Sequence, residues 1–125
     1  MNIPEGILCT RTHSWALEEE KEVLVGLTDW QASNMGDIVS FDLPEDGMYL
    51  KKDEPFATLE SIRMAYELYM PVSGKIIEVN EQLINSPELI NEDCYKNWII
   101  KIEPDNFPED SQDLIEYVDY IDELS

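Results

Sequence analysis

Short apolar segments that alternate with turn residues predict a mainly β chain. The segments are five to seven residues long, contain many β-branched or aromatic side chains, and are bounded by Gly, Pro, Asp or Asn. In the segment 56–62, for example, Ala57, Leu59 and Ser61 fall on one face. The predicted strands are residues 23–27, 38–43, 56–62, 66–70, 74–79 and 98–102.

The two central segments, residues 56–62 and 66–70, are close enough in sequence to form a hairpin. Arg63-Met64-Ala65 would then lie at or near its tip. A weak internal echo, Gly-x-Ile followed by an aliphatic residue, occurs at residues 36–39 and again at 74–77. Two copies of such a strand–turn unit would form a quasi-symmetric β-sandwich that presents the hairpin at one end.

Two short helical segments are predicted within the strand-rich region. Thr28 or Asp29 can cap a helix that Gly36 ends, because a short polar side chain favours the N-terminal cap and glycine the C-terminal one. A second helical turn is expected over residues 85–90, with Ser86 as its N-cap and Pro87 at the first helical position.

The C-terminal segment, residues 109–125, is expected to form an acidic helix. Ser111 is the expected N-cap. Apolar side chains recur after it at helical spacing and would dock on the sandwich: Leu114, Ile115, Val118 and Ile121. With 125 residues, the chain is expected to be a single domain, residues 1–125, that needs no disulfide or metal to fold.

Charge and composition exclude several classes of function. The chain has 28 acidic and 8 basic residues and a net charge of −20, which argues against binding to nucleic acid or to an anionic membrane. Cys9 and Cys94 lie far apart and His13 is the only histidine, so no zinc or iron–sulfur site is expected. Residues 1–15 resemble neither a signal peptide nor a transit peptide, and a cytoplasmic location is therefore expected.

A series of short motifs runs in order from residue 13 to residue 104. The motifs include His13-Ser14-Trp15, Gly26-Leu27-Thr28-Asp29-Trp30, Gly36-Asp37-Ile38-Val39, Leu43-Pro44, Leu59-Glu60-Ser61-Ile62-Arg63, Leu68-Tyr69-Met70-Pro71-Val72-Ser73-Gly74 and Trp98-Ile99-Ile100-Lys101-Ile102. In this order and spacing they resemble the H protein family of the glycine cleavage system, which has His-Glu-Trp, Gly-Ile-Thr-Asp, Leu-Gly-Asp-Ile-Val, Leu-Pro-x-x-Gly, Val-Glu-Ser-Val-Lys-Ala and Pro-Val-Ser-Gly at the matching places.

The resemblance implies both a fold and a role. The fold would be a mainly β, lipoyl/biotinyl-type barrel-sandwich hybrid, a hammerhead-like β-sandwich with short helices and a C-terminal helix. The role would be that of a carrier without catalysis of its own, whose hairpin lysine bears a lipoyl group. Candidate partners are then a lipoate ligase, the glycine-cleavage decarboxylase, the aminomethyltransferase and dihydrolipoyl dehydrogenase.

The position that the family uses for its lipoyl lysine holds Arg63, aligned through Glu60-Ser61 and residues 71–74. Lipoylation needs a neutral amine that attacks an activated acyl group. A guanidinium stays a cation with delocalised lone pairs and is a poor nucleophile, so this replacement is conservative in charge only. No cofactor is therefore expected, and lipoate is expected only if the chain is a genuine carrier.

The resemblance also implies the positions of the arm pocket. Ser14 stands where the family has an acid after the histidine, so a cationic adduct would lose a stabilising charge there. Glu67 keeps an acid near the other side of the pocket, and Glu60 and Ser61 precede the attachment position. We interpret Glu60 and Glu67 as solvated charges or partner contacts, not as a catalytic pair.

Three functions are compatible with these residues. The chain can be a non-lipoylated interaction or regulatory paralogue of the carrier. It can be a genuine lipoyl carrier in which Arg63 is a mutation or is bypassed by another lysine. It can also be a small-molecule binding module that uses the cleft which shelters the arm in the family.

Overall fold

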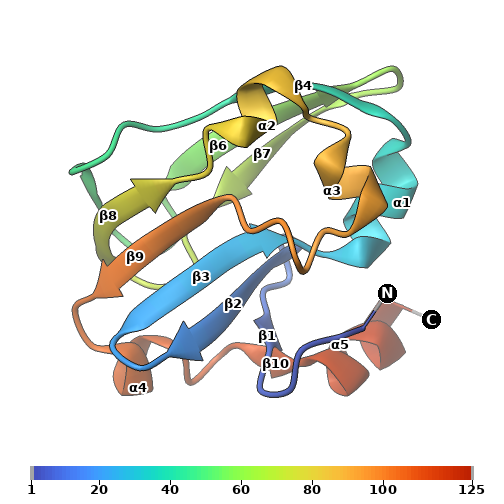
Figure 1. Cartoon of the computed structure of the whole chain (residues 1–125). Coiled ribbons are helices and arrows are strands. Elements are labelled where there is room, and N and C mark those ends of the chain that lie inside the picture. Colours follow the sequence, from blue (N-terminus) through green and yellow to red (C-terminus); the bar gives the residue numbers. More distant parts are fainter. Residues whose placement is uncertain (1, 125) are drawn as a thin grey trace.

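A computed structural model describes residues 2–124 and shows strands with short helices at their ends (Figure 1). The strands are β1 (Leu8–Cys9), β2 (Ser14–Glu19), β3 (Glu22–Leu27), β4 (Ile38–Asp42), β5 (Tyr49–Leu50), β6 (Pro55–Ser61), β7 (Ala65–Tyr69), β8 (Gly74–Val79), β9 (Ile100–Pro104) and β10 (Ile115–Glu116). The helices are α1 (Asp29–Met35), α2 (Gln82–Asn85), α3 (Leu89–Glu92), α4 (Phe107–Asp110) and α5 (Tyr117–Leu124).

The strands form two antiparallel sheets. The larger sheet has seven strands in the order β10-β1-β2-β3-β9-β8-β5, and the smaller has three in the order β4-β6-β7. Apolar side chains from both sheets and from the helices join in one buried cluster. The predicted mainly β, sandwich-like fold with short helices is therefore confirmed.

Close packing around Trp15 shows how the core is built. The indole is completely buried, and its Nε1 donates to the carbonyl of Cys94 at 3.2 Å. A Cβ atom on Gly26, its neighbour across β2 and β3, would lie 2.6 Å from the indole ring. The absence of a side chain at Gly26 therefore leaves room for the indole. The Tyr95 ring packs on the indole, with ring centroids 5.7 Å apart.

Helix α1 has the caps that the sequence predicts. The Thr28 hydroxyl accepts from the amide of Gln31, and Gly36 ends the helix with φ +75°. That backbone conformation is costly for most residues with a side chain, whereas glycine adopts it freely. The helix start and end are thus local properties of the sequence.

Five of the six predicted strands agree with the structure to within one residue at each end, and the sixth is displaced by two residues. Strand β9 begins at Ile100 and includes Pro104, whereas residues 98–102 were expected. Pro104 is accommodated because it lies at the strand end, where it pairs with Gly74 of β8. Strands β1, β2, β5 and β10 were not predicted; β1, β5 and β10 have two residues each, too few to show a periodic pattern.

The two glycines of the internal echo have different roles in the structure. Gly36 ends a helix at positive φ, and its carbonyl accepts from Asn91. Gly74 begins β8, and a Cβ atom there would lie 2.5 Å from the carbonyl oxygen of Glu103. The echo therefore does not mark two copies of one backbone turn.

The predicted helical turn over residues 85–90 is wrong in its bounds. Ser86 is the C-cap of α2, not an N-cap, and its carbonyl accepts from the amide of Leu89. Pro87 lies before α3, which begins at Leu89. Local capping chemistry indicated a helix boundary at Ser86 but not whether a helix begins or ends there.

The predicted C-terminal helix over residues 109–125 is also wrong in its bounds. Ser111 is the C-cap of α4, and the long helix begins only at Tyr117. Between them Ile115 pairs with Cys9 at the edge of the larger sheet, so tertiary pairing overrides the helical spacing. Val118 does not dock on the sandwich, because its side chain is 69% exposed.

Among residues 2–124 no helix is long and apolar enough to cross a membrane.

We expect Gly74→Ala to lower the free energy of unfolding by about 1–3 kcal/mol, because the new methyl would overlap the backbone of β9. Gly47→Asn is the control: Gly47 has φ +91° and open space around it, and asparagine tolerates that conformation, so a change within about 0.5 kcal/mol is expected. Urea denaturation measures both variants. Equal stability of Gly74→Ala and the wild-type chain would contradict this packing account.

Candidate functional site

The loop between β6 and β7 is the hairpin apex that the sequence predicts. Ser61 ends β6 and organises the loop: its amide donates to the carbonyl of Met64 at 2.8 Å. Its hydroxyl accepts from the amides of Arg63 at 3.1 Å and of Met64 at 3.2 Å. The Ser61 hydroxyl thus satisfies two of the three amides of the loop, those of Arg63 and Met64.

The Arg63 side chain folds back onto the end of α1. Its Nη1 donates to the carbonyl of Asn34 at 3.2 Å, and its guanidinium lies against Gly36. Backbone carbonyls at the C-terminus of a helix carry partial negative charge and lack partners in the helix. Helix α1 has no basic residue of its own in its last turn, so Arg63 supplies that cation from another element.

The rest of the apex is attached to the corner between α1 and β4. The amide of Ile62 donates to the carbonyl of Asp37 at 3.3 Å, and Ile38 pairs with Ser61. Apolar side chains nevertheless remain exposed around this attachment: Val39 by 53%, Ile62 by 72% and Met64 by 41%. We call Val39, Ile62, Arg63 and Met64 the apex patch.

Glu60 and Glu67 lie on the outer face of the three-stranded sheet. Glu60 pairs with Ala65 and Thr58 pairs with Glu67, so side-chain alternation places both carboxylates on the face opposite buried Leu59 and Leu68. Glu67 accepts from the Tyr69 hydroxyl at 2.9 Å, and this bond raises the pKa of Tyr69. Neither carboxylate faces the interior.

Ser14, the other predicted pocket residue, is completely buried at the start of β2. Its hydroxyl lies 3.0 Å from the hydroxyl of Thr10 and donates to the carbonyl of Tyr69 at 3.4 Å. The structure therefore brings Glu60, Ser61, Arg63 and Glu67 together on one hairpin and encloses Ser14 behind it. The assignment of these residues to an arm pocket remains a prediction.

His13 belongs to a polar and aromatic cluster that sequence patterns did not reveal. It stacks on Trp30 with ring centroids 4.6 Å apart, and its Nδ1 lies 2.7 Å from the Tyr120 hydroxyl. That hydroxyl lies 2.8 Å from Oγ1 of Thr28, the N-cap of α1. When Nδ1 is unprotonated, Tyr120 donates to it and accepts from Thr28, which completes the chain of hydrogen bonds. Burial lowers the pKa of His13.

Asp29 is a second residue whose contacts the sequence did not indicate. Its carboxylate accepts from the Tyr95 hydroxyl and from the Tyr117 hydroxyl, each at 2.7 Å. Burial, followed by this contact with Asp29, raises the pKa of Tyr117. Burial likewise raises the pKa of Cys9 and of Cys94 to about 12, so both thiols are unreactive at neutral pH.

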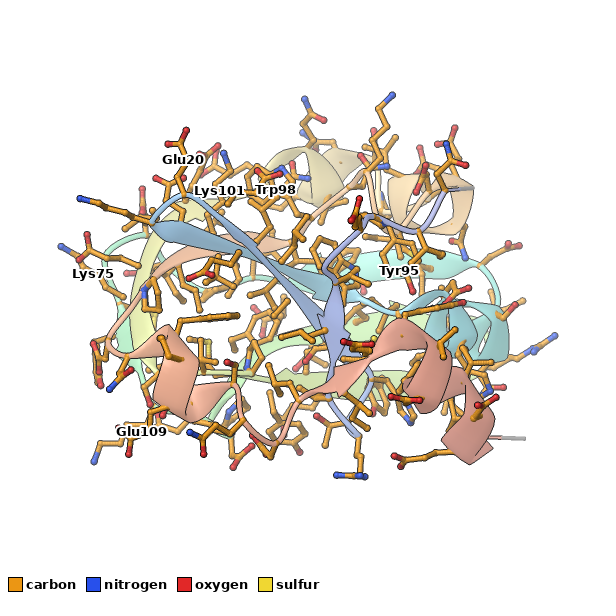
Figure 2. The ribbon with its side chains drawn as sticks, turned by 90° about the horizontal axis from the view of Figure 1, so that it is seen from below. Glu20, Lys75, Tyr95, Trp98, Lys101 and Glu109 are labelled. Carbon is orange, nitrogen blue, oxygen red and sulfur yellow. The ribbon has the colours of Figure 1, made fainter. Side chains whose placement is uncertain are left out.

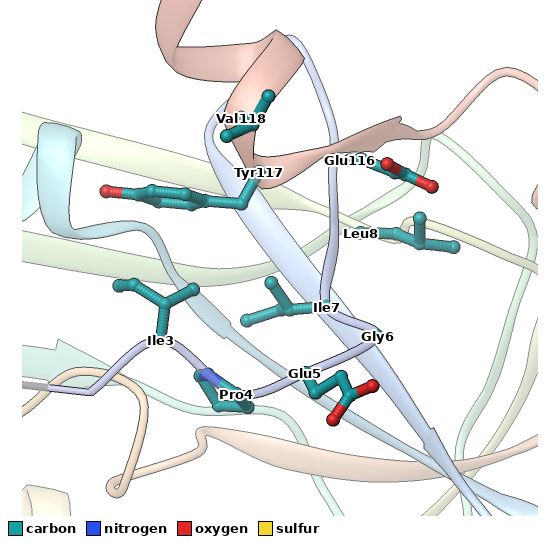
Figure 3. Close-up of a pocket in the computed structure, with 9 residues that line it drawn as sticks. All are labelled: Ile3, Pro4, Glu5, Gly6, Ile7, Leu8, Glu116, Tyr117 and Val118. Atoms are coloured by element: carbon teal, nitrogen blue, oxygen red, sulfur yellow. The ribbon is translucent and has the colours of Figure 1, made fainter.

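A pocket of about 460 Å³ lies between the N-terminal segment and the start of α5 (Figure 3). Residues 3–8 and 116–118 line it, and none of the predicted site residues is among them. Within residues 2–124, no group of three or more His, Cys, Asp or Glu side chains is arranged to hold a metal ion. The hairpin apex remains the place where the predicted residues gather.

Comparison with known proteins agrees with the motifs. The family model described as glycine cleavage H-protein matches residues 7–125. A probable glycine cleavage system H protein of Pyrococcus abyssi is 45% identical over 123 residues, which cover 98% of this chain and 92% of that protein. The chain belongs to the glycine cleavage H-protein family. Members of this family are carriers, not enzymes, and work with the glycine cleavage enzymes.

Two further relatives support the assignment. The glycine cleavage system H protein of Oceanobacillus iheyensis is 45% identical over 105 residues, covering 83% of each chain. The crystal structure of a glycine cleavage system H protein from Mycobacterium marinum superposes with a TM-score of 0.87, with 27% identity and 98% of both chains covered. The H-protein fold therefore extends over almost the whole chain.

We expect the free energy of unfolding to fall as the pH drops below about 6.5, the ordinary pKa of histidine. Because burial lowers the pKa of His13 in the folded protein, the unfolded chain binds the proton first, and stability is lost until the lower folded pKa is reached. His13→Asn should flatten this part of the profile, since asparagine tolerates the φ of +72° at this position.

Urea denaturation at a series of pH values, with NMR titration of the single histidine, measures both effects. If His13→Asn showed the same slope as the wild-type chain between pH values of about 5 and 7, another group would be responsible.

Proposed function

We propose that this chain is an H-protein family member that is not lipoylated at its hairpin apex. It acts instead as an interaction or regulatory paralogue of the lipoyl carrier. The observation that carries the proposal is Arg63 in the apex loop, with its guanidinium bonded to the carbonyl of Asn34. The family's carrier role is coupled to a lysine amine at the apex, and this chain has there a guanidinium that donates to a backbone carbonyl.

The residues at the apex do not fit a lipoyl group. An amide link to the arm needs a nitrogen that can lose a proton and attack an acyl group, and a guanidinium does neither near neutral pH. A swinging arm must also be free to reach successive enzymes, whereas the side chain of Arg63 rests on the end of α1. Both the chemistry and the contact of Arg63 therefore favour a role without the arm.

Other lysines are poor substitutes because of where they lie. Lys51 and Lys52 precede β6, whose seven residues put them about 23 Å from the apex. Lys52 is also engaged, since its Nζ donates to the carbonyl of Asp110 at 2.6 Å and pairs with Asp113. Figure 2 shows Lys75 at the opposite end of the ribbon from α1, and Lys101 lies over the Trp98 ring at 4.9 Å.

The apex patch supports a docking role. Ile62 and Met64 flank Arg63 at the tip of the hairpin, and both side chains are substantially exposed. The adjoining outer face of the sheet carries Glu60 and Glu67. A partner that recognises H proteins by their hairpin can contact this surface, with an apolar site for the tip and basic residues toward the sheet.

We expect the purified chain to gain no mass when it is produced together with a lipoate ligase and lipoate. Arg63→Lys should gain the mass of one lipoyl group, because it restores an amine at the same place on the hairpin. Intact mass spectrometry, followed by peptide mapping, measures both proteins.

Two results would decide against the proposal. A lipoylated wild-type chain would show that another lysine serves as carrier, and peptide mapping would identify it. If neither the wild-type chain nor Arg63→Lys gained a lipoyl group, the ligase would not recognise this hairpin, and the docking part of the proposal would be removed.

We expect an excess of the wild-type chain to slow the lipoylation of a lipoylatable H protein, because both compete for the ligase through their hairpins. Ile62→Ser combined with Met64→Ser should reduce this inhibition about tenfold or more, the loss of one or two buried apolar contacts. Val118→Ser is the matched control, since Val118 is 69% exposed and Ile62 is 72% exposed. Equal inhibition by the apex variant and the control would contradict docking through the apex.

A further inference from the structure

Asn91 bonds to the corner between α1 and β4, next to the hairpin apex. Its Nδ2 donates to the carbonyl of Gly36 at 2.8 Å, and its Oδ1 accepts from the amide of Ile38 at 2.9 Å. The carbonyl can only accept and the amide can only donate, so this orientation of the carboxamide is the one that satisfies both. Asn91 therefore pairs with residues 36–38 as a peptide unit of a neighbouring strand would.

Asp37, which lies between Gly36 and Ile38, bonds to the apex loop. The carbonyl of Asp37 accepts from the amide of Ile62 at 3.3 Å. The carbonyl of Asn34, at the end of α1, accepts from Arg63. The corner is thus bonded to Asn91 on one element and to the apex loop on another, and each apex contact is made to a backbone atom of the corner or of the helix turn before it.

Few local interactions restrict the backbone of the corner between α1 and β4. Helix α1 has only seven residues and ends at Gly36, whose amide donates to Ala32 at 3.2 Å. Glycine at positive φ has more freedom than any other residue, and short helices fray at their ends. A side chain from α3 that satisfies both a donor and an acceptor of the corner therefore restricts its backbone.

We propose that Asn91 is a positioning residue for the hairpin apex. By bridging Gly36 and Ile38, it sets where the carbonyl of Asp37 stands, and so it sets the orientation and order of residues 62–64. This geometry determines how an apex-binding protein, such as a lipoate ligase, meets the loop. The last step rests on the proposed docking function, whereas the ordering of the apex does not.

Residue-specific amide exchange, measured by NMR under conditions where every variant is folded, tests the ordering. In Asn91→Ala the Ile62 amide should exchange about five- to tenfold faster than in the wild-type chain, the effect of losing one or two hydrogen bonds. In Asn91→Asp the amide of Ile38 keeps its acceptor but Gly36 loses its donor, so the Ile62 amide should exchange faster than in the wild-type chain but more slowly than in Asn91→Ala.

Asn80→Ala is the matched control. The Asn80 carboxamide donates to the carbonyl of Trp98 at 2.8 Å, a bond of the same kind that does not involve residues 36–38. In Asn80→Ala the Ile62 amide should therefore exchange as in the wild-type chain. The proposal is overturned if Asn91→Ala leaves the Ile62 amide unchanged, or if all protected amides accelerate equally, because the effect would then be absent or global.

A second measurement tests recognition, in an Arg63→Lys background that supplies an amine to a lipoate ligase. Adding Asn91→Ala should lower the rate of lipoylation at limiting substrate about fivefold, and adding Asn80→Ala should not. If Asn91→Ala speeds exchange of the Ile62 amide but leaves lipoylation unchanged, Asn91 orders the apex but has no effect on recognition by the ligase. If Arg63→Lys is never lipoylated, the proposed docking fails and the exchange experiment alone decides the role of Asn91.

Discussion

The turn at Gly36 is the constraint on which the geometry of the hairpin apex depends. At φ +75° it ends α1 and directs the chain into β4 within one residue. The turn thereby offers the backbone of residues 34–38 to two other elements: Asn91 pairs with Gly36 and Ile38, and the apex pairs with Asn34 and Asp37. Ser61 bonds the loop internally, and the contacts with Asn34 and Asp37 attach the loop to the body beside it.

The contact of Arg63 with α1 combines electrostatics with chemistry. The chain carries a net charge of −20, and a cation at the end of a helix that has no basic residue in its last turn is favourable there. The same guanidinium cannot take the acyl group that a lysine would accept. In the proposed function, the central side chain of the apex therefore serves the fold and the surface instead of an arm.

Helix α1 links this apex to the C-terminal helix. The carbonyl of Asn34 near its C-terminus accepts from Arg63, while its N-cap Thr28 and its first residue Asp29 bond to Tyr120 and Tyr117 of α5. The His13 ring joins the same cluster through Tyr120. Because one short helix is bonded at both ends by distant segments, its position is set by tertiary contacts more than by its own seven residues.

Local sequence determined the features that depend on neighbouring residues. The strands of the central hairpin, its apex around Arg63, the caps Thr28 and Gly36 and the ordered family motifs follow from alternation, capping chemistry and spacing. Only the tertiary structure decided the bond of Arg63 to Asn34, the bridge from Asn91, the burial of Ser14 and the pairing of Ile115 with Cys9. The reason is that each of these contacts joins segments far apart in the chain, where the gain in packing or hydrogen bonding exceeds the local preference that a sequence pattern records.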